Sequence, residues 1–496
     1  MMEMKKYDLI VIGAGPGGIW GAKRAADFGK RVAIVEQTGM IGGAGINTGT
    51  VPSKTLRETA LALSGWRSRE LFGVDLSLRR EATIGDFMYH EKHVTDHERQ
   101  RFEGLLGRRG VEIFYGKGSF VDPHTLQVVR PTGEELALEG DKILVATGSS
   151  PIRPPEFPFH DERVRDSNQI LELKTLPKRL AVIGAGVIGS EYACVFAVLG
   201  TEVHLIDGRH QLLPFLDKEV SAALGQAMSD GGVIFRWGER VIECDVTRAD
   251  AVLLTLSSGA RLEVDALLVA GGRKSNTEQL NLSAAGLKPG ERGLLSVDLN
   301  YRTAVPHIYA VGDVIGPPAL ASTSIAQARV AMFHAFATNL KAEVAPVLPV
   351  GIFTIPEVSM VGETEESLAV RDVDFVVGHA NYLDVPRGEM VGERIGFLKL
   401  LFRRADMRLL GVHVIGEHAT ELVHLGELTM LVEGGSELLT RACFNTPTLS
   451  DLYRIATYKA LLACQENGRV KKPTHASEQT TARRRRTALQ DSPIKK

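Results

Sequence analysis

Cysteine is scarce in this chain of 496 residues, which contains only Cys194, Cys244, Cys443 and Cys464. These four lie far apart, and their spacing matches neither a disulfide framework nor a cysteine-rich metal site. We therefore expect no structural disulfide and no bound metal. We expect Cys443 to be a small buried thiol.

Long apolar runs are also absent, since none reaches the ~18–20 residues that span a bilayer. The N-terminus, "MMEMKKYDLIVIGAG", passes from a short polar lead into an apolar strand, without the pattern of a signal peptide. A hydrophobic content of 44% and a charged content of 24% are typical of globular proteins. The sequence predicts a cytoplasmic protein of two to four domains without a membrane span.

The net charge is only −2, but it is unevenly distributed. Residues 468–496 hold nine Lys and Arg against two Asp and Glu, a charge of +7, which leaves −9 on residues 1–467. This tail is polar and ends in "ARRRRTALQDSPIKK", a composition that predicts disorder. A basic arm can bind nucleic acid, but we expect a solvated extension with weak, nonspecific contacts.

Glycine is abundant, with 51 residues, and several of them form a nucleotide-binding pattern near the N-terminus. In "YDLIVIGAGPGGIWGAKRAADFGKRVAIVEQ", an apolar strand leads into Gly13, Gly15 and Gly18, and a second apolar strand ends at Glu36. Such glycines let the backbone approach a pyrophosphate, whose charge is met by the N-terminus of the next helix. The acid is suited to accept hydrogen bonds from ribose hydroxyls.

The same unit recurs in "RLAVIGAGVIGSEYACVFAVLGTEVHLID", with Gly184, Gly186, Gly189 and the acid Asp207. In both copies the acid follows the first glycine by 23 residues. One such motif is weak, but two copies of strand, turn, helix, strand and acid are hard to explain by packing alone. The sequence thus predicts two dinucleotide sites in one chain.

Three further strands end at small or polar residues. "KILVATGSSPIRPP" ends at Thr147-Gly148 before a proline-rich segment that we interpret as a linker, and "DALLVAGGRKSN" closes the second unit near Gly272. "HIYAVGDVIG" leads a strand into Gly312-Asp313. Asp313 could accept hydrogen bonds from the polyol chain of a cofactor, or cap the helix that follows, and both interpretations stay open.

In this order, the motifs resemble the flavoprotein pyridine nucleotide–disulfide oxidoreductases, which include glutathione reductase, dihydrolipoamide dehydrogenase and mercuric reductase. Besides the two glycine motifs, the resemblance rests on "VPSK", "ATGS", "GSEYA", "GGR", "YAVGDV", "IPEVSMVGETE" and "FNTPTLSDL". It covers nearly everything between residues 7 and 463. It implies an α/β fold with two Rossmann-like dinucleotide-binding domains, as in glutathione reductase, and a C-terminal α+β dimerisation domain that makes a homodimer.

The resemblance also implies domain boundaries and binding residues. The expected domains are an FAD-binding domain (1–155 and 275–345), an NAD(P)-binding domain (156–274), a dimerisation domain (346–467) and the basic tail (468–496). The residues expected to bind FAD are Gly13, Gly15, Gly18, Glu36, Gly43, Gly45, Thr50, Lys54, Thr147, Gly148, Gly312 and Asp313. Those expected to bind NAD(P) are Gly184, Gly186, Gly189, Glu191, Asp207, Arg209 and Gly272.

Lys54 and Glu191 are the expected catalytic residues. In the family, the lysine of the Pro-Ser-Lys element lies beside the flavin N5 and pairs with the glutamate of the second glycine motif. The positive charge of Lys54 would stabilise the anionic reduced flavin. A buried Lys–Glu pair is unfavourable unless it is well satisfied, which favours function over packing. The alternative is an ordinary ion pair on a helix surface.

The chain departs from the family at its thiols and at its catalytic base. Disulfide reductases carry G-G-x-C-x-N-x-G-C-x-P-S-K, and in "IGGAGINTGTVPSK" the two cysteine positions are Gly45 and Thr50. Neither residue can exchange a disulfide. The family's His-Pro-Thr-x-x-Glu reads Thr446-Pro447-Thr448 followed by Asp451, and threonine does not transfer protons near neutral pH. The two losses together predict a changed second half-reaction.

Without a thiol partner, the simplest acceptor for the electrons is a second nicotinamide nucleotide. The chain is similar to the soluble (Si-specific) pyridine nucleotide transhydrogenase subgroup in "GTVPSKTLR", "VGDVIG", "GIFTIPE" and "FNTPT". That subgroup keeps a cysteine at the position of Gly45, so this chain goes one step further. The predicted activity is hydride transfer between NADPH and NAD⁺, with FAD, NAD and NADP as cofactors and substrates.

Two other functions stay open. A diaphorase or quinone reductase would pass electrons from an exposed flavin to a quinone or another small acceptor. A non-enzymatic flavin or nucleotide sensor would use the basic tail to contact a partner.

The end of the second unit bears on the nucleotide: Asp207 favours a free 2′-hydroxyl, whereas Arg209 could meet a 2′-phosphate. The same residues also suit an ordinary turn after a strand.

Overall fold

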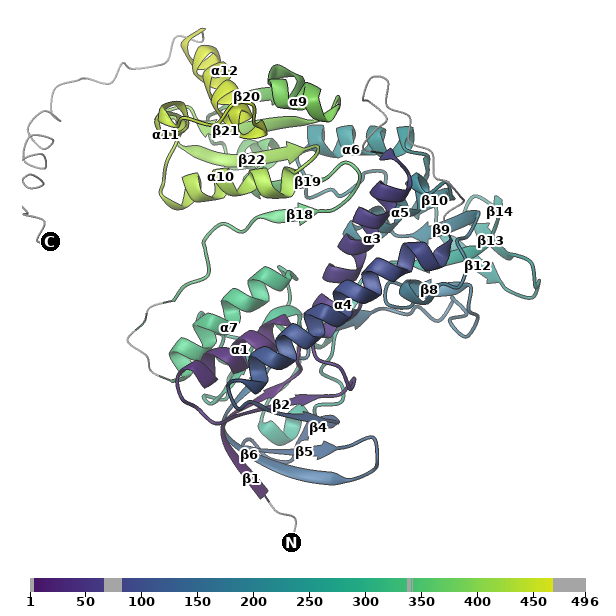
Figure 1. Ribbon diagram of the computed structural model, residues 1–496, viewed down its shortest axis with the longest axis vertical. Coiled ribbons are helices and arrows are strands. Elements are labelled where there is room, and N and C mark those ends of the chain that lie inside the picture. Colours follow the sequence, from purple (N-terminus) through teal and green to yellow (C-terminus); the bar gives the residue numbers. More distant parts are fainter. Residues whose placement is uncertain (1–3, 67–82, 337–339, 341, 467–496) are drawn as a thin grey trace, which may run out of the picture.

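The structure is a computed structural model that describes residues 4–66, 83–336, 340 and 342–466. These residues form three units, each built around a β-sheet. In Figure 1 the first unit lies at the bottom, the second at the right and the third at the top. The predicted basic tail, residues 468–496, lies outside the described residues.

The first unit contains a mixed sheet. Its strands are β1 (Met4–Ile12), β2 (Val32–Glu36), β3 (Glu112–Tyr115), β4 (Lys117–Phe120), β5 (Thr125–Val129), β6 (Glu135–Val145) and β17 (Ile308–Ala310). The parallel strands have the order β3-β2-β1-β6, and β17 lies parallel to the carboxyl end of β6. β5 pairs antiparallel with the amino half of β6, and β4 pairs antiparallel with β5. The carboxyl ends of β1, β6 and β17 therefore meet at one edge, where ligands of such sheets bind.

The alternation of side chains along β1 explains how this sheet is covered. Leu9 and Val11 pack against helices α1 (Pro16–Asp27) and α7 (Ala321–Ala335) on one face. Ile10 and Ile12 belong to an apolar cluster on the opposite face. Both faces are thus buried, as is usual for parallel strands with continuous apolar sequences.

The second unit repeats this design. Its parallel sheet has the order β11-β10-β9-β15-β8 and is flanked by helices and by a small antiparallel sheet. The elements are β8 (Val164–Asp166), β9 (Arg179–Ile183), α5 (Val187–Val198), β10 (Glu202–Asp207), α6 (Lys218–Asp230), β11 (Val233–Trp237), β12 (Val241–Asp245), β13 (Val252–Leu256), β14 (Arg261–Val264) and β15 (Ala266–Val269).

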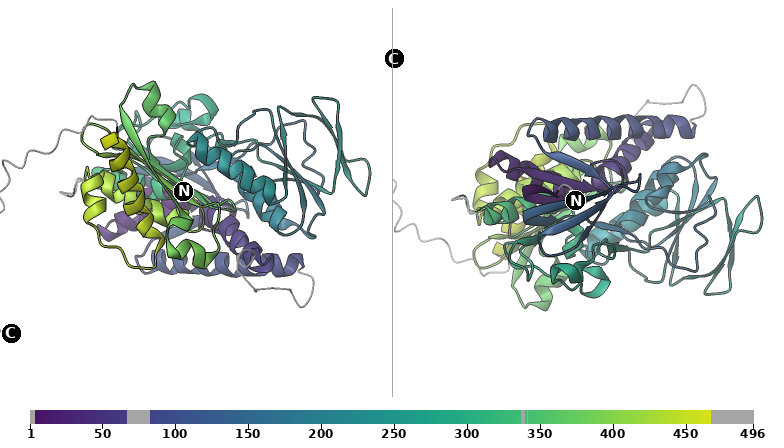
Figure 2. Two further views of the ribbon diagram at one scale, coloured as in Figure 1. Left: turned by 90° about the horizontal axis from the view of Figure 1, so that it is seen from above. Right: turned by 90° about the horizontal axis from the view of Figure 1, so that it is seen from below.

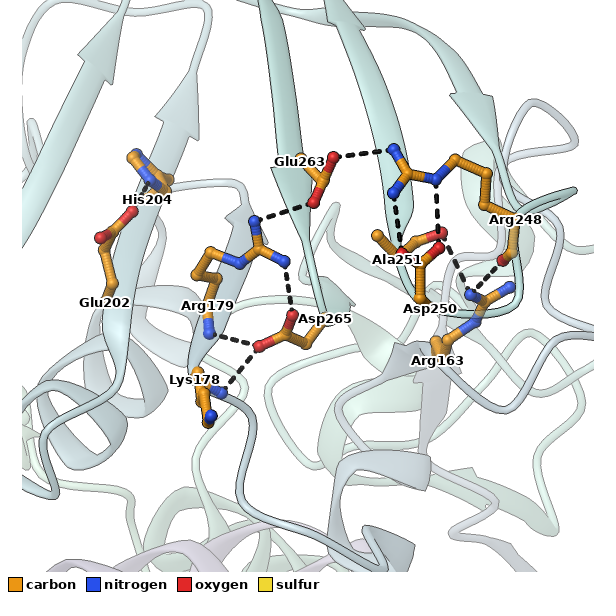
Figure 3. Close-up of polar contacts among 10 residues, drawn as sticks. All are labelled: Arg163, Lys178, Arg179, Glu202, His204, Arg248, Asp250, Ala251, Glu263 and Asp265. Atoms are coloured by element: carbon orange, nitrogen blue, oxygen red, sulfur yellow. Dashed lines mark hydrogen bonds and ion pairs between the residues drawn. The ribbon is translucent and has the colours of Figure 1, made fainter.

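Charged side chains join neighbouring strands and loops of the second unit (Figure 3). Arg179, at the start of β9, pairs with Glu263 and Asp265, and Arg248 pairs with Glu263 and Asp250. The glycines follow the opposite, carboxyl end of β9. This network therefore lies away from the glycine loop.

The third unit is an antiparallel sheet of order β18-β19-β22-β21-β20 with helices packed on it. Its elements are β18 (Val350–Ile352), β19 (Val358–Gly362), α8 (Glu365–Val370), β20 (Phe375–Asn381), α9 (Pro386–Val391), β21 (Phe397–Arg403), β22 (Leu409–Ile415), α10 (Ala419–Leu431), α11 (Ser436–Arg441) and α12 (Leu452–Glu466). Together with the mixed sheet of the first unit and the parallel sheet of the second, it confirms the predicted α/β fold with an α+β C-terminal part.

A helical arm connects the units. After the short α2 (Gly43–Asn47), helices α3 (Thr50–Leu63) and α4 (Ile84–Gly107) lie side by side and extend from the first unit toward the second (Figures 1 and 2). α3 packs on α5 of the second unit. One apolar cluster includes side chains of α3, α4, the second sheet and the third unit, so burial of apolar surface holds the three units together.

The chain crosses between the first two units twice, and the two crossings pair with each other. β7 (Ser149–Pro151) and β16 (Arg273–Ser275) form an antiparallel ribbon. Just beyond it, the N–H of Ile152 donates to the carbonyl of Gly272 over 2.9 Å. Within the described ranges, no helix has both the length and the apolar character that crossing a bilayer requires.

Candidate nucleotide-binding and active site

The first glycine of each loop adopts a backbone conformation that disfavours side chains. Gly13 has φ +99° and Gly184 has φ +100°. The third glycine of each motif lies against the first: a Cβ on Gly18 or Gly189 would come within 1.9 Å of the carbonyl oxygen of Gly13 or Gly184. Both loops therefore require glycine for the same two reasons, a left-handed turn and close contact between helix and strand.

The helices that follow these loops begin without a side-chain cap. Gly15 is the N-cap residue of α1 and Gly186 that of α5, and neither helix has an acidic residue in its first turn. Amide N–H groups at such a helix start need acceptors, and the helix dipole favours an anion there. Both sites thus fit the pyrophosphate of a dinucleotide.

In each nucleotide-binding motif, the acid at the end of the second strand is hydrogen-bonded to the glycine loop. Glu36 accepts hydrogen bonds from the N–H of Ala14 and from the N–H and Oγ1 of Thr38, each over 2.8 Å. Asp207 accepts from the N–H of Ala185 over 2.7 Å. Each acid is thus tied to the residue that follows the first glycine of its own loop.

Asp207 differs from Glu36 because its second partner is charged. The Nε and Nη2 of Arg209 donate to the two oxygens of Asp207 over 2.9 and 2.7 Å, and the N–H of Arg209 donates over 2.8 Å. Burial opposes ionisation of Asp207, yet the hydrogen bonds from Arg209 and Ala185 lower its pKa to about 2. The carboxylate is therefore ionised, and Asp207 and Arg209 form a direct ion pair.

The predicted FAD residues from the ends of β6 and β17 also come together. Asp313 accepts a hydrogen bond from Ser149 Oγ over 2.5 Å, and Arg273 Nε donates to that same Oγ over 2.8 Å. Thr147 Oγ1 is buried without a hydrogen-bond partner among the described residues, as expected for a group that contacts a ligand. The adjacent N–H of Gly312 is already satisfied, since it donates to a glutamine side chain on α7.

The interpretation of Asp313 as a helix cap is wrong. α7 begins at Ala321, and its N-cap residue is Leu320, which makes no side-chain cap. Asp313 lies instead in a short 3₁₀ turn, several residues before the helix. Ser149 and Arg273 stand in the "ATGS" and "GGR" segments but received no role from the sequence, because the contacts of Ser149 with Asp313 and of Arg273 with Ser149 join distant parts of the chain.

The loop that lacks the family's cysteines packs directly on the first glycine loop. The N–H of Gly42 donates to the carbonyl of Ala14 over 2.7 Å, and a Cβ on Gly43 would lie 2.7 Å from the Cα of Gly15. A Cβ on Gly45 would lie 2.6 Å from Cγ of Pro16. The loop thus leaves no free space for a larger side chain at one of the two positions where the family has a thiol.

Lys54 and Glu191 meet across the boundary between the first two units. Lys54 Nζ, on α3, lies 2.6 Å from Glu191 Oε2, on α5. The side chain of Lys54 is 26% exposed and that of Glu191 only 7%, so the pair is not a surface ion pair on one helix. The ammonium is open on one side, while its carboxylate partner is held within the protein.

Phe353, which the sequence analysis did not assign a role, completes this arrangement. Its backbone N–H donates to Glu191 Oε1 over 2.9 Å, and its ring lies 5.0 Å from Lys54 Nζ. Nearby, the buried Arg57 on α3 donates from Nε to the carbonyl of Thr354 over 2.9 Å. Segment 353–354 therefore connects α3 to α5 and limits the directions in which Lys54 can point.

The third unit carries the segment in which threonine replaces the family's histidine. Thr446 is exposed, and Asp451 pairs with Arg454 of its own helical turn over 2.7 Å. The prediction of a buried Cys443 is wrong: its side chain is exposed, because residues 442–448 form an irregular surface segment between α11 and the next helical turn.

Acidic residues gather at another boundary, between the second and third units. One carboxylate oxygen from each of Asp217, Glu219 and Glu365 lies within 4.8 Å of the others, close enough to share one cation. The ammonium of Lys399, a buried residue of β21, lies among them, at 2.9 Å from Asp217 and Glu219 and in contact with Glu365. A protein cation thus occupies the position that a metal would take.

Family models match most of the chain. The model described as pyridine nucleotide-disulphide oxidoreductase matches residues 7–335, and that described as the dimerisation domain of the same family matches residues 348–456.

Curated relatives are similar over almost their whole length. The soluble pyridine nucleotide transhydrogenase of Mycobacterium bovis BCG Pasteur is 45% identical over 454 residues, covering 91% of this chain and 97% of that protein. The protein of the same name from Colwellia psychrerythraea is 40% identical over 458 residues, covering 92% and 98%.

Solved structures have the same fold. LpdA from Mycobacterium tuberculosis superposes with a TM-score of 0.84 at 26% identity, covering 92% of this chain and 99% of that one. The Cu(II) complex of RclA, an HOCl-induced flavoprotein disulfide reductase from Escherichia coli, superposes with a TM-score of 0.83 at 27% identity, covering 92% and 100%.

Proposed function

The chain belongs to the pyridine nucleotide–disulphide oxidoreductase family, and from this we propose that it transfers hydride between NADPH and NAD⁺ through FAD, without a redox disulfide. Relatives that are 40–45% identical over most of the chain are named soluble pyridine nucleotide transhydrogenases. The observation that carries the proposal is a combination. The Lys54–Glu191 pair and both dinucleotide loops are kept, while Gly45 and Thr50 stand where the family has its two thiols.

The residues of the first unit fit FAD. The uncapped start of α1 would hold the pyrophosphate, Glu36 the ribose, and Thr147 and Asp313 the remaining polar groups of the cofactor. FAD supplies the hydride chemistry: when bound, it accepts a hydride from one nicotinamide nucleotide and donates it to another. The protein has to bind, orient and tune it.

Lys54 has the geometry to do this tuning. Its ammonium is partly exposed, held at one side by Glu191 and Ser53, and its ring contact with Phe353 restricts its motion. A fixed positive charge stabilises negative charge that develops beside it during hydride transfer, because it needs no reorganisation at that moment. We propose that Lys54 and Glu191 act as this catalytic pair.

The uncapped start of α5 and the Asp207–Arg209 pair fit a nicotinamide nucleotide in the second unit. Donor and acceptor would use this site in turn, in a ping-pong reaction. A dithiol relay cannot compete, since Gly45 and Thr50 carry no thiol. A nucleotide that accepts a hydride needs no catalytic base to transfer a proton to it, which agrees with threonine at position 446.

The match to the family's dimerisation domain supports a homodimer formed by the third unit. We further propose that the enzyme is soluble and works in the cytoplasm, because its relatives are named soluble pyridine nucleotide transhydrogenases.

The decisive experiment is stopped-flow reduction of the purified yellow protein by NADPH, followed by mixing with NAD⁺ or with a quinone. We expect NAD⁺ to restore the absorbance of oxidised flavin in a fast phase. Failure of NAD⁺ to do so would overturn the transhydrogenase proposal, and fast reoxidation by the quinone alone would favour the diaphorase.

A further inference from the structure

The two dinucleotide sites differ in charge at the position that distinguishes nucleotides. In the first unit, the uncharged Thr38 satisfies Glu36, whereas in the second unit the cation Arg209 satisfies Asp207. The acid at the end of this strand marks the ribose 2′-position in dinucleotide-binding folds. Of the two acids, only Asp207 is therefore paired with a cation beside the position where a 2′-substituent would lie.

Arg209 by itself does not give this site a net positive charge. Its guanidinium is engaged with both oxygens of Asp207, so the pair sums to zero. Asp207 is ionised, since its pKa is lowered to about 2 by these hydrogen bonds against the effect of burial. A phosphate dianion would meet a neutral ion pair there, and a second cation is needed to favour it.

The neighbouring strand supplies that cation. Asp207 is in register with Trp237 of β11, and beyond them the N–H groups of Gly238 and Glu239 donate to the carbonyls of Arg209 and Asp207. The segment 238–240 therefore runs alongside 207–209. The hydrogen bonding between these two segments continues past the end of the sheet, and it places the side chain of Arg240 over the turn formed by residues 207–209.

The side chain of Arg240 lies across Gly208, the residue between Asp207 and Arg209. A Cβ on Gly208 would be 3.1 Å from Arg240 Nε and 3.8 Å from Nη2, so the missing side chain of Gly208 provides the space for the guanidinium. Among the described residues, Arg240 has no carboxylate within ion-pair distance. The adjacent Glu239 is turned away, toward Ser257 Oγ at 2.7 Å and the N–H of Ser258 at 3.1 Å.

We propose that Arg240 is the residue that binds the 2′-phosphate of NADP(H) in the second site. This inference rests on the proposed function and adds its nucleotide specificity. With Arg240, the group of Asp207, Arg209 and Arg240 carries a net charge of +1, which attracts a phosphate. When the ribose has a free hydroxyl instead, Asp207 remains its acceptor and Arg240 stays in water. One site then serves both nucleotides.

The test measures binding, not turnover. The purified full-length, flavin-containing protein and its variants are titrated with adenosine 2′,5′-bisphosphate and with adenosine 5′-monophosphate, which differ only in the 2′-phosphate. For Arg240→Ala we expect affinity for the bisphosphate to fall about tenfold, as for the loss of one charge-assisted hydrogen bond at an exposed site. Affinity for the monophosphate should stay within about twofold.

Two further variants control this result. Arg236→Ala removes the same charge from an exposed position of β11, and it should leave the preference for the bisphosphate intact. Arg240→Lys, which keeps a point charge, should lose less than Arg240→Ala. Equal loss for both ligands in Arg240→Ala, an unchanged affinity for the bisphosphate, or the same effect in Arg236→Ala would each overturn the proposal.

Failure of the inference about Arg240 is distinguishable from failure of the proposed transhydrogenase function. Wild-type protein that binds the bisphosphate through Arg240, yet does not pass hydride from NADPH to NAD⁺, would leave this inference standing and remove the transhydrogenase proposal. If the wild-type protein passes hydride and the preference for the bisphosphate survives Arg240→Ala, the transhydrogenase proposal stands and the inference about Arg240 falls.

Discussion

Lys54 Nζ lies 2.6 Å from Glu191 Oε2, and this contact connects a helix of the first unit to a helix of the second. The two residues are 137 positions apart in sequence. Their pairing therefore depends on how the two nucleotide units are arranged, and it positions a cation where they meet.

Replacement of Lys54 by alanine should slow reduction of the flavin by NADPH by roughly one to two orders of magnitude, because a fixed charge beside the reacting atoms is lost. FAD should remain bound, since the pyrophosphate loop of α1 is untouched. Stopped-flow absorbance measures the rate, and the flavin spectrum measures the cofactor content.

The matched control is Lys23→Ala, which removes the same charge from an ion pair with Asp27 on α1. It should leave the rate unchanged. Equal rates in wild type and Lys54→Ala would remove Lys54 from the mechanism.

Replacement of Gly45 by alanine should destabilise the protein by about 1–3 kcal/mol, as overpacking does in tightly packed sites. The reason is the 2.6 Å separation between its Cβ and Cγ of Pro16. We expect a lower melting temperature and a lower FAD content. Gly107→Ala is the control, since a Cβ there meets no atom within 4 Å. A wild-type melting temperature in Gly45→Ala would show that the loop relaxes freely.

Lys399→Met should cost about 3–5 kcal/mol, because it leaves the buried carboxylate of Asp217 without its cation. Asp217, whose side chain is 1% exposed, would bear most of this effect. Denaturant unfolding measures the loss. The control is Lys459→Met, which breaks an exposed ion pair with Asp384 and should cost at most about 1 kcal/mol. Similar losses in both variants would contradict a special role for the buried cluster.

The Asp207 carboxylate should contribute to stability in a pH-dependent way. Its folded pKa, about 2, lies below its ordinary value of 3.8, so its contribution is complete above pH ~4 and is lost as the pH falls toward 2. The unfolding free energies of wild type and Asp207→Asn should thus differ by about 1–2 kcal/mol at pH 6 and converge in acid. A constant difference between pH 6 and pH 2.5 would contradict this assignment.

Local spacing predicted those parts of the molecule that depend on local geometry. The pattern of Gly13 and Gly18, repeated in Gly184 and Gly189, is readable because turn, strand and helix are adjacent in sequence. Lys54 and Glu191 came from resemblance to a family, since no local pattern connects them. Ser149, Arg273, Phe353 and Arg240 were missed because each acts through a contact with a distant segment.

Two local interpretations failed for related reasons. Asp313 looked like a helix cap because an alanine-rich helix follows, but the chain first makes a 3₁₀ turn and α7 starts only at Ala321. Cys443 looked buried because free cysteine usually is. Whether a residue lies on a surface segment is decided by the packing of α11 and α12, which the neighbouring residues do not encode.

The ribbon of β7 and β16 has a consequence for the origin and the engineering of the molecule. Because Ile152 and Gly272 are hydrogen-bonded neighbours, the second unit enters and leaves the first at a single point. A segment whose ends meet can be inserted into a host, or exchanged for a homologous one, without stretching either framework. Residues 152 and 272 are therefore the junctions at which the second unit would be exchanged for a homologous one, and such a unit would have to keep the contacts of α5 with α3, including that of Glu191 with Lys54.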